Sequence, residues 1–393
     1  MKIVVVLKDF PCPAQPEPGI FVLRQIQALQ RFDHEFLVVR VVPHAPPLGQ
    51  KWRGYRSIPP RYTYEDVDVL TMRAVFPPGM IGLEYVRYQV SRRLSCIIQS
   101  FNPQLLHAHC LIPAGSYVIG KQLPTLVTAH GSDAYDWPWQ RPGLRRLAES
   151  VANSATIIVA VSNFIRRHVE RLGRSTVEVV FNGADDTVFS PAHREAARAK
   201  LGIKLNRPVV AFAGSLARSK GVFDLVAATE KLHDLVPLLV IIGEGPQSAG
   251  LKRFLDQARI EYRLCGVLTQ SEIATAFGAA DIVALPSYRE GLPVVVCEAM
   301  LAGRAVLSTP VGGIPEIIAD YETGRLVPAG DVEALSSALR ELYLNPELKQ
   351  KLEQQARNFA AAHLTWRANA ARYDRLYSDT LSRFSNSGRR LVS

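Results

Sequence analysis

The sequence predicts an α/β fold made of two doubly wound domains that face each other across a cleft, each built on a parallel sheet. Three observations support this prediction. The chain has 393 residues, which is more than a single hydrophobic core usually serves. Short apolar runs rich in β-branched residues alternate with helical patterns along its whole length. The alternation starts afresh near residue 190, where Pro191 and Pro208 flank a polar stretch.

The first half contains apolar runs that predict buried strands. These runs are Ile3–Leu7, Phe36–Val42, Val67–Met72, Leu105–Ala108, Leu126–Thr128, Thr156–Ala160 and Val177–Phe181. Apolar positions three and four residues apart predict helices over Phe21–Gln30 and Leu83–Phe101 between them. Strands that alternate with helices form a parallel sheet covered on both faces.

The second half repeats this pattern. Its predicted strands are Val209–Ala213, Leu238–Ile242, Tyr262–Cys265, Ile282–Leu285, Ala305–Ser308 and Arg325–Val327. The chain then ends in amphipathic patterns that predict helices over Asp331–His363 and Trp366–Arg383. We therefore expect an N-terminal domain at residues 1–190, a C-terminal domain at 191–365 and a final helical segment at 366–393.

Composition narrows the class of protein. Hydrophobic residues make up 48% of the chain and charged residues 21%, as in globular proteins. The five cysteines are scattered without a C-x-x-C pair, which favours a reducing cytoplasm and gives no reason to expect a metal. The apolar runs are too short for a signal peptide or a membrane-spanning helix, so we expect a cytoplasmic protein.

The formal net charge of +10 favours anionic partners. Nucleic acid is not expected, because no dense basic run carries interleaved aromatic residues. An anionic membrane surface is one alternative, with the protein peripheral on the inner face and acting on a lipid-linked acceptor; solvated surface arginines are the other. The arginines concerned lie on two predicted helices and are Arg87, Arg92, Arg93, Arg141, Arg145 and Arg146.

Glycine-rich loops follow several strands of the second half. In Gly214–Gly221, Arg218 and Lys220 add positive charge where the amino end of the next helix would attract a diphosphate. An ordinary basic turn is the alternative. Gly243 and Gly266 follow the next two strands, where they suit either a nucleotide contact or tight turn geometry.

Two carboxylates follow the strand Ile282–Leu285. Glu290 is expected in a loop just before a helix, and Glu298, eight residues later, two turns into that helix. This spacing is near two helical turns, so both carboxylates can face one cleft. Carboxylates accept hydrogen bonds from vicinal hydroxyls such as those of ribose or a pyranose. Alternatively, Glu290 stabilises the helix dipole and Glu298 pairs with a surface cation. Gly312–Glu316 then opens another helix.

Histidines mark the ends of two strands in the first half. His107 and His109 lie on one face of a strand because alternate residues share a face. His130 follows the next strand, in the segment His130–Asp133, where an imidazole could bond an acceptor hydroxyl or a developing charge. Packing in the core is the alternative for His107.

Together and in this order, these motifs resemble the large retaining glycosyltransferase family four, of the group 1 type, whose members have the GT-B fold of two Rossmann-like domains. The resemblance covers nearly the whole chain. Its pieces are Gly19, His107–His109, His130–Asp133, Asn182–Asp185, Gly214–Gly221, Gly243–Pro246, Glu290–Glu298 and Gly312–Glu316.

The resemblance implies roles for individual residues. Catalytic roles fall to His130, Arg218, Lys220 and Glu290. Donor-binding roles fall to Gly19, Gly214, Ser215, Gly243, Gly266, Gly291, Leu292 and Glu298. The acceptor side is assigned His109, Asp133 and Arg73. The final helix would cross back to the N-terminal domain.

The resemblance further implies transfer of a sugar from a UDP- or GDP-sugar to a glycan, a lipid-linked acceptor or a small molecule, in bacterial polysaccharide or glycoconjugate biosynthesis. No cofactor and no metal are expected, because cations and helix amino ends would stabilise the leaving diphosphate. A sugar-nucleotide epimerase and a catalytically weak, nucleotide-sugar-binding subunit are the alternatives. The sequence departs from the family at Ser215, where an arginine is usual, and in the first loop, where Gly19 stands without a second glycine.

Overall fold

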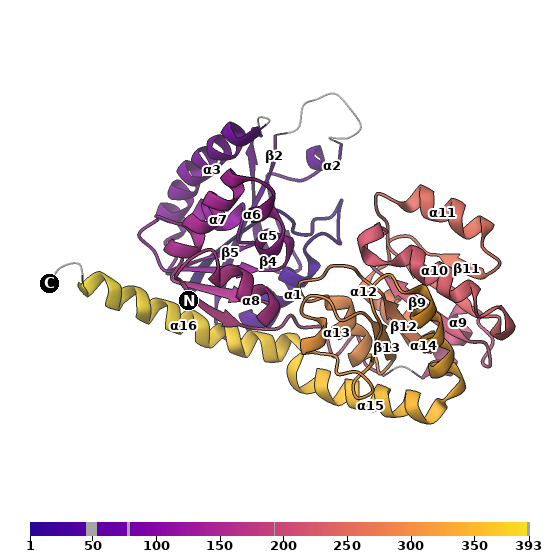
Figure 1. Cartoon of the computed structure of the whole chain (residues 1–393). Helices are drawn as coiled ribbons and strands as arrows, with labels where there is room; N and C mark the ends of the chain where they lie inside the picture. The colour runs from indigo at the N-terminus through magenta and orange to yellow at the C-terminus, as the bar shows by residue number, and fades with distance from the viewer. Residues whose placement is uncertain (45–52, 77–78, 192, 391–393) are drawn as a thin grey trace. The chain divides into compact units, whose positions relative to one another are not determined.

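The computed structural model describes residues 1–44, 53–76, 79–191 and 193–390 and resolves the chain into two compact α/β units, as the sequence predicted (Figure 1). Unit 1 consists of Met1–Phe181 and Arg367–Ser393, and unit 2 consists of Asn182–Trp366. We had placed the first boundary at 190, and the units divide after Phe181. Residues following Phe181 group with unit 2 because the backbone of Ala184 hydrogen-bonds to Leu364 and Trp366.

In its described residues, unit 1 contains an eight-stranded sheet in the order β3-β4-β2-β1-β5-β6-β7-β8. The strands are β1 (Lys2–Leu7), β2 (Glu35–Pro43), β3 (Arg61–Tyr64), β4 (Val67–Ala74), β5 (Leu105–His109), β6 (Thr125–Ala129), β7 (Ile157–Ala160) and β8 (Thr176–Val179). All neighbouring pairs are parallel except β3 with β4. The strand order reverses direction at β1, which lies between β2 and β5.

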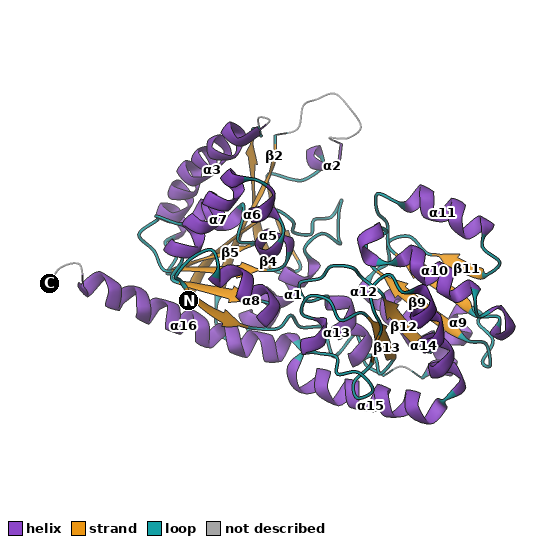
Figure 2. Cartoon of the chain, viewed as in Figure 1, coloured by secondary structure: helices purple, strands orange, loops and turns teal. Residues whose placement is uncertain are grey.

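Helices join the strands of unit 1 (Figure 2). They are α1 (Ile20–Gln30), α2 (Arg53–Arg56), α3 (Gly79–Phe101), α4 (Ala114–Val118), α5 (Ser132–Tyr135), α6 (Trp137–Gln140), α7 (Pro142–Ser154), α8 (Asn163–Glu170) and the terminal α16 (Trp366–Arg390). The short edge strand β3 was not predicted, because its residues alternate between exposed and half-buried positions and carry no continuous apolar run.

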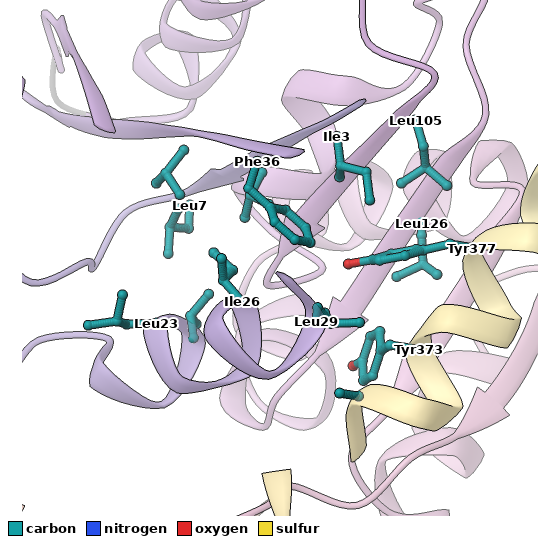
Figure 3. Packing of buried hydrophobic residues seen from close by; sticks show 14 of the residues in the cluster. Ile3, Leu7, Leu23, Ile26, Leu29, Phe36, Leu105, Leu126, Tyr373 and Tyr377 are labelled. Carbon is teal, nitrogen blue, oxygen red and sulfur yellow. The ribbon is translucent and has the colours of Figure 1, made fainter. Parts of the chain in front are cut away.

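The core of unit 1 contains residues from both the N-terminal and the C-terminal parts of the chain. Apolar side chains of β1, α1, β2, β5 and β6 form one buried cluster with Tyr373 and Tyr377 of α16. Figure 3 shows these two tyrosines beside Leu29, Phe36 and Leu126. Burial of aromatic side chains of this size is a large part of core stability, so α16 is an integral part of unit 1.

Unit 2 has a six-stranded parallel sheet in the order β11-β10-β9-β12-β13-β14, again counted over its described residues. The strands are β9 (Val209–Ala213), β10 (Leu238–Ile242), β11 (Glu261–Leu264), β12 (Ile282–Leu285), β13 (Ala305–Ser308) and β14 (Arg325–Leu326). The helices are α9 (Arg194–Leu201), α10 (Val222–Glu230), α11 (Ser248–Gln257), α12 (Gln270–Ala279), α13 (Val294–Leu301), α14 (Val332–Leu344) and α15 (Pro346–His363). The strand order reverses at β9, between β10 and β12.

The long helix predicted over Asp331–His363 was wrong in one respect, because it is two helices. The helix is interrupted at Asn345, between the end of α14 and Pro346, the first residue of α15. The Asn345 side chain accepts a hydrogen bond from the backbone of Leu348 and so caps α15. Proline at the first helical position and asparagine before it are the usual start of a helix.

Candidate functional site

Three loops of unit 2 meet where its strand order reverses. They follow β9, β12 and β13, and such reversal points are where doubly wound sheets bind ligands. The backbone N–H of Tyr288 donates to the carbonyl of Ser219 at 2.8 Å, which ties the first two loops together. The N–H of Gly313 donates to the carbonyl of Gly291 at 2.9 Å and ties in the third.

Lys220 and Glu290 form an ion pair at this junction. Lys220 belongs to a 3-10 turn after β9 (η2, Arg218–Lys220). Its Nζ lies 2.7 Å from Oε1 of Glu290, and the Ser287 hydroxyl donates to the same oxygen at 2.7 Å. Glu290 is buried, whereas 27% of the Lys220 side chain is exposed. The lysine charge therefore neutralises a buried carboxylate and still reaches solvent.

Gly312 allows the third loop to approach this pair. Its φ is +60°, and a β-carbon at this position would lie 1.9 Å from the carbonyl oxygen of Glu290. Any other residue would push the two loops apart, because no flexible side chain is available to move. Steric contact with the Glu290 carbonyl therefore explains why this position of the Gly312–Glu316 motif is a glycine.

Glu298 lies on α13, in its second turn. Glu290 precedes the helix in a loop, as predicted, but α13 begins only at Val294, so Glu298 is the fifth residue of the helix rather than two full turns into it. The Glu298 carboxyl is buried, and burial raises its pKa to about 7, although a hydrogen bond with the Gln270 side chain opposes the shift. A buried carboxyl with one amide partner has unused capacity for hydroxyl donors.

Neighbouring loops of the same unit are joined through backbone hydrogen bonds. The N–H of Gly243 donates to the Gly266 carbonyl at 2.7 Å, and the N–H of Gly214 donates to Ile242. Ser215 is exposed beside them. The predicted glycines of these loops therefore lie together at the carboxyl ends of β9, β10 and β11.

Two further predicted donor-site residues have defined surroundings. The Arg218 guanidinium lies over the ring of Phe223, 4.8 Å from its centroid, which keeps it at the start of α10. Leu292 is buried, and its carbonyl accepts a hydrogen bond from the Asn182 side chain at 3.0 Å. Asn182, the first residue of its motif, thus supports the loop after β12.

Unit 1 contains a cavity of about 580 Å³ at the carboxyl ends of β1, β2, β5 and β6. Gly19, His109 and His130 are among the residues that line it. Gly19 has a φ of +73°, and a β-carbon there would lie 1.9 Å from the carbonyl oxygen of Asp9. The first loop can therefore close against the end of β1 only with glycine at this position.

Three histidines meet beside this cavity. Nδ1 of His109 lies 3.0 Å from Nε2 of His130, and the two rings are stacked. His107 lies deeper, where its ring nitrogens contact the hydroxyls of Tyr377 at 2.9 Å and Thr128 at 2.8 Å. The sequence predicted that His107 and His109 share a face, and core packing, the alternative given for His107, is what the structure shows.

Burial keeps these imidazoles neutral. It lowers the pKa of His107 to about 3 and that of His130 to about 4, and it lowers the pKa of His109 well below the ordinary value. For His107 and His109, a second and smaller cause that lowers the pKa is repulsion from a charged neighbouring imidazole. At neutral pH these imidazoles therefore carry no charge and interact through hydrogen bonds.

Asp133 and Arg73, both predicted on the acceptor side, bind backbone in this structure. The Asp133 carboxylate accepts hydrogen bonds from the N–H groups of Leu111, Gly131 and His130. The Arg73 guanidinium donates to the carbonyls of Tyr55 at 2.9 Å and Ile58 at 2.7 Å. Neither is among the described residues that line the cavity.

Several residues of both sites escaped the sequence analysis. Ser287 and Gln270, the partners of the two glutamates, lie in or beside recognised motifs, yet only the fold reveals their pairing. Phe76 and Trp137 line the unit 1 cavity. For Phe76, the available signal was an aromatic residue in the loop after β4.

In the described ranges, no three His, Cys, Asp or Glu side chains are grouped so that they could hold a metal ion. Nor does any helix in that part of the chain have the length and apolar character needed to cross a bilayer.

Comparison with known proteins identifies glycosyltransferases as relatives of this chain. Residues 193–359 match the family model of glycosyl transferases group 1, and residues 19–188 match that of glycosyltransferase family 4. An alpha-maltose-1-phosphate synthase of Mycolicibacterium smegmatis is 34% identical over 62% of this chain and 70% of its own length. TuaC of Bacillus subtilis, named as a teichuronic acid biosynthesis glycosyltransferase, is 28% identical over 86% of this chain and 88% of its own.

A solved structure has the same fold. The crystal structure of Anabaena HepE in complex with UDP-glucose matches with a TM-score of 0.74 and 19% identity, over 96% of this chain and all of that one. The two parallel-sheet units are therefore those of the GT-B fold, as the sequence predicted.

Proposed function

The chain belongs to the group 1, family 4 glycosyltransferases, and from this premise we propose that it is a retaining, metal-independent enzyme that transfers a sugar from a UDP- or GDP-sugar to an acceptor. The observation that carries the proposal is the junction of Lys220, Glu290 and Gly312 in unit 2, where an ammonium group and bare backbone meet a buried carboxylate. Such a junction suits a diphosphate and a sugar hydroxyl at once.

The donor is held in unit 2 in this proposal. Lys220 and Arg218 stabilise the negative charge that develops on the leaving diphosphate, and so supply the charge that a metal would otherwise provide. Glu290 accepts a hydrogen bond from a donor-sugar hydroxyl, and Glu298 accepts from the ribose. The complex of HepE with UDP-glucose supports a nucleotide-sugar donor of this kind.

Retention of configuration follows the family. A double displacement would need a carboxylate nucleophile beside the anomeric carbon. Glu290, which contacts Lys220 and Ser287, accepts a hydrogen bond from a sugar hydroxyl in this proposal and so is not the nucleophile. A same-face reaction in which the leaving diphosphate assists the acceptor is therefore the better fit, with His130 against the donor sugar.

The acceptor is a glycan, a lipid-linked molecule or a small molecule, in bacterial polysaccharide or glycoconjugate biosynthesis. TuaC, whose name refers to teichuronic acid biosynthesis, supports this setting. Attachment to the inner face of an anionic membrane remains part of the proposal. Sedimentation with vesicles of phosphatidylglycerol, compared with phosphatidylcholine vesicles, tests it directly.

Donor binding tests the proposal first. The full chain is heated with UDP, GDP, ADP and their glucose conjugates, and a ligand that binds the folded state raises the melting temperature. We expect a rise with a uridine or guanosine diphosphate and a smaller rise with Lys220→Ala. Absence of a shift with all of these nucleotides would contradict the proposal, and conversion of the donor without any acceptor would indicate an epimerase instead.

A further inference from the structure

The cavity of unit 1 is mostly apolar. Its wall is built largely from aliphatic and aromatic side chains, among them Leu7, Phe21, Val41, Phe76, Pro113 and Trp137. The charged side chains among the described lining residues are Lys8 and Asp9, and both are exposed. A volume of about 580 Å³ lies within the usual range for a small-molecule site.

Such a wall is poorly matched to a bare sugar or polyol. Each hydroxyl of a sugar loses its water on binding and needs a new hydrogen-bond partner. Leu7, Val41 and Pro113 have no side-chain donor or acceptor to offer. An aryl or alkyl group, by contrast, gains free energy in proportion to the apolar area that leaves water.

One part of the cavity is polar, because His109 and His130 are among its lining residues and His130 is partly exposed. His109 and His130 share one proton between Nδ1 and Nε2. Whichever ring donates that proton, one outer nitrogen of the pair is a donor and the other an acceptor, because a neutral imidazole has one of each. Nε2 of His109 is buried and has no partner among the described residues.

The apolar character continues to the surface. Phe76 and Trp137 both line the cavity, and they are 41% and 37% exposed. Val75, next to Phe76 in the chain, is 49% exposed. Large apolar side chains that line a cavity and are also exposed to solvent are typical of the entrances of ligand-binding sites.

We propose that this cavity binds an amphiphilic acceptor, with one hydroxyl at the His109–His130 pair and an aryl or alkyl body along the apolar wall toward Phe76 and Trp137. The proposal rests on the glycosyltransferase function proposed above, and it selects acceptors with an apolar body over plain glycans and polyols. The shared chemistry of a lipid chain and an aromatic aglycone is an apolar group next to a hydroxyl.

Three glucosides with the same sugar separate these possibilities. Calorimetry measures the binding of methyl, n-octyl and 4-nitrophenyl β-D-glucopyranoside to the full chain, with the octyl compound kept below its micellar concentration. We expect the octyl or nitrophenyl compound to bind about tenfold or more tightly than the methyl compound, because only the apolar body differs. Stronger binding of the octyl compound indicates a lipid acceptor, and stronger binding of the nitrophenyl compound an aromatic one.

A pair of phenylalanine variants locates the binding. Phe76→Ser should weaken binding of the better apolar glucoside severalfold. Phe32→Ser is the matched control, since Phe32 is 38% exposed in the same unit and is not among the cavity's lining residues. The proposal fails if the three glucosides bind equally, or if Phe76→Ser and Phe32→Ser behave alike. Binding of UDP to the same preparations reports on the donor site, so a failure there would count against the proposed function separately.

Discussion

Lys220 and Glu290 neutralise each other in the free protein, with Nζ of the lysine 2.7 Å from Oε1 of the glutamate. In the proposed function both groups bind the donor, so a nucleotide sugar would replace this contact with its own. The diphosphate would then bind the lysine, and a sugar hydroxyl would donate to the glutamate.

Lys220→Ala should lower kcat about 10²–10³-fold, because it removes a cation from the charge that develops on the diphosphate. Release of the nucleoside diphosphate in the presence of acceptor gives the rate. Lys231→Ala is the control, since Lys231 forms an exposed ion pair with Glu333 in the same unit. Turnover of the Lys220 variant close to that of the Lys231 variant would refute the assigned role.

Gly312→Ala should abolish nucleotide binding while leaving most of unit 2 folded. The new β-carbon would meet the Glu290 carbonyl oxygen and force apart the loops after β12 and β13. Gly202→Ala is a close control, because Gly202 has a φ of +61° and nothing lies within 4 Å of the corresponding β-carbon. Equal nucleotide affinity of the two variants would show that the contact is unimportant.

Glu298 should make the stability of unit 2 depend on pH. Its pKa is about 7 in the folded protein against 4.5 for a free side chain, so the folded state holds the extra proton between these values. The contribution of Glu298 therefore becomes less favourable as pH rises from 4.5 to 7. Integrated over that interval, the change is on the order of 3 kcal/mol.

Glu298→Gln should remove this dependence. Urea unfolding at pH 5 and pH 8 is expected to show the variant gaining free energy of unfolding relative to the parent protein as pH rises, while its affinity for the nucleotide falls. The neutral histidines of unit 1 act in the opposite direction, but they are common to both proteins and cancel. A constant difference between the two proteins would contradict the predicted linkage.

Tyr377→Phe should destabilise unit 1 by about 1–2 kcal/mol, because it leaves Nδ1 of buried His107 without its partner. Tyr64→Phe serves as the control, since the Tyr64 hydroxyl has no hydrogen bond among the described residues. Denaturant unfolding followed by circular dichroism measures both. Equal stability of the two variants would show that the His107 contact contributes nothing.

The buried strands could be predicted because parallel sheets covered on both faces require continuous apolar runs. β9 and β10 are buried at every position, and both were predicted with their observed bounds. β3 was missed for the opposite reason. It is an exposed edge strand that pairs with β4 through a turn at Glu65 and Asp66, both with positive φ, and neither residue is the glycine that usually marks such a turn.

The candidate site was predictable in its residues but not in its pairings. Glycines, cations and carboxylates placed directly after strands indicated the loops that meet in unit 2. The spacing of Glu290 and Glu298 could not be converted into geometry, because Pro293 delays the start of α13. The contacts of Asp133 and Arg73 with backbone likewise depend on loops distant in the sequence.

Unit 1 is assembled from both ends of the chain, since α16 supplies Tyr373 and Tyr377 to its core. A ribosome makes those residues only after the whole of unit 2. Part of the apolar surface of the nascent N-terminal sheet therefore stays exposed until α16 is made. Unit 2, by contrast, can fold as soon as it leaves the ribosome. Premature termination anywhere before α16 would leave that surface open to aggregation, so this enzyme depends on complete translation more than its two-unit architecture suggests.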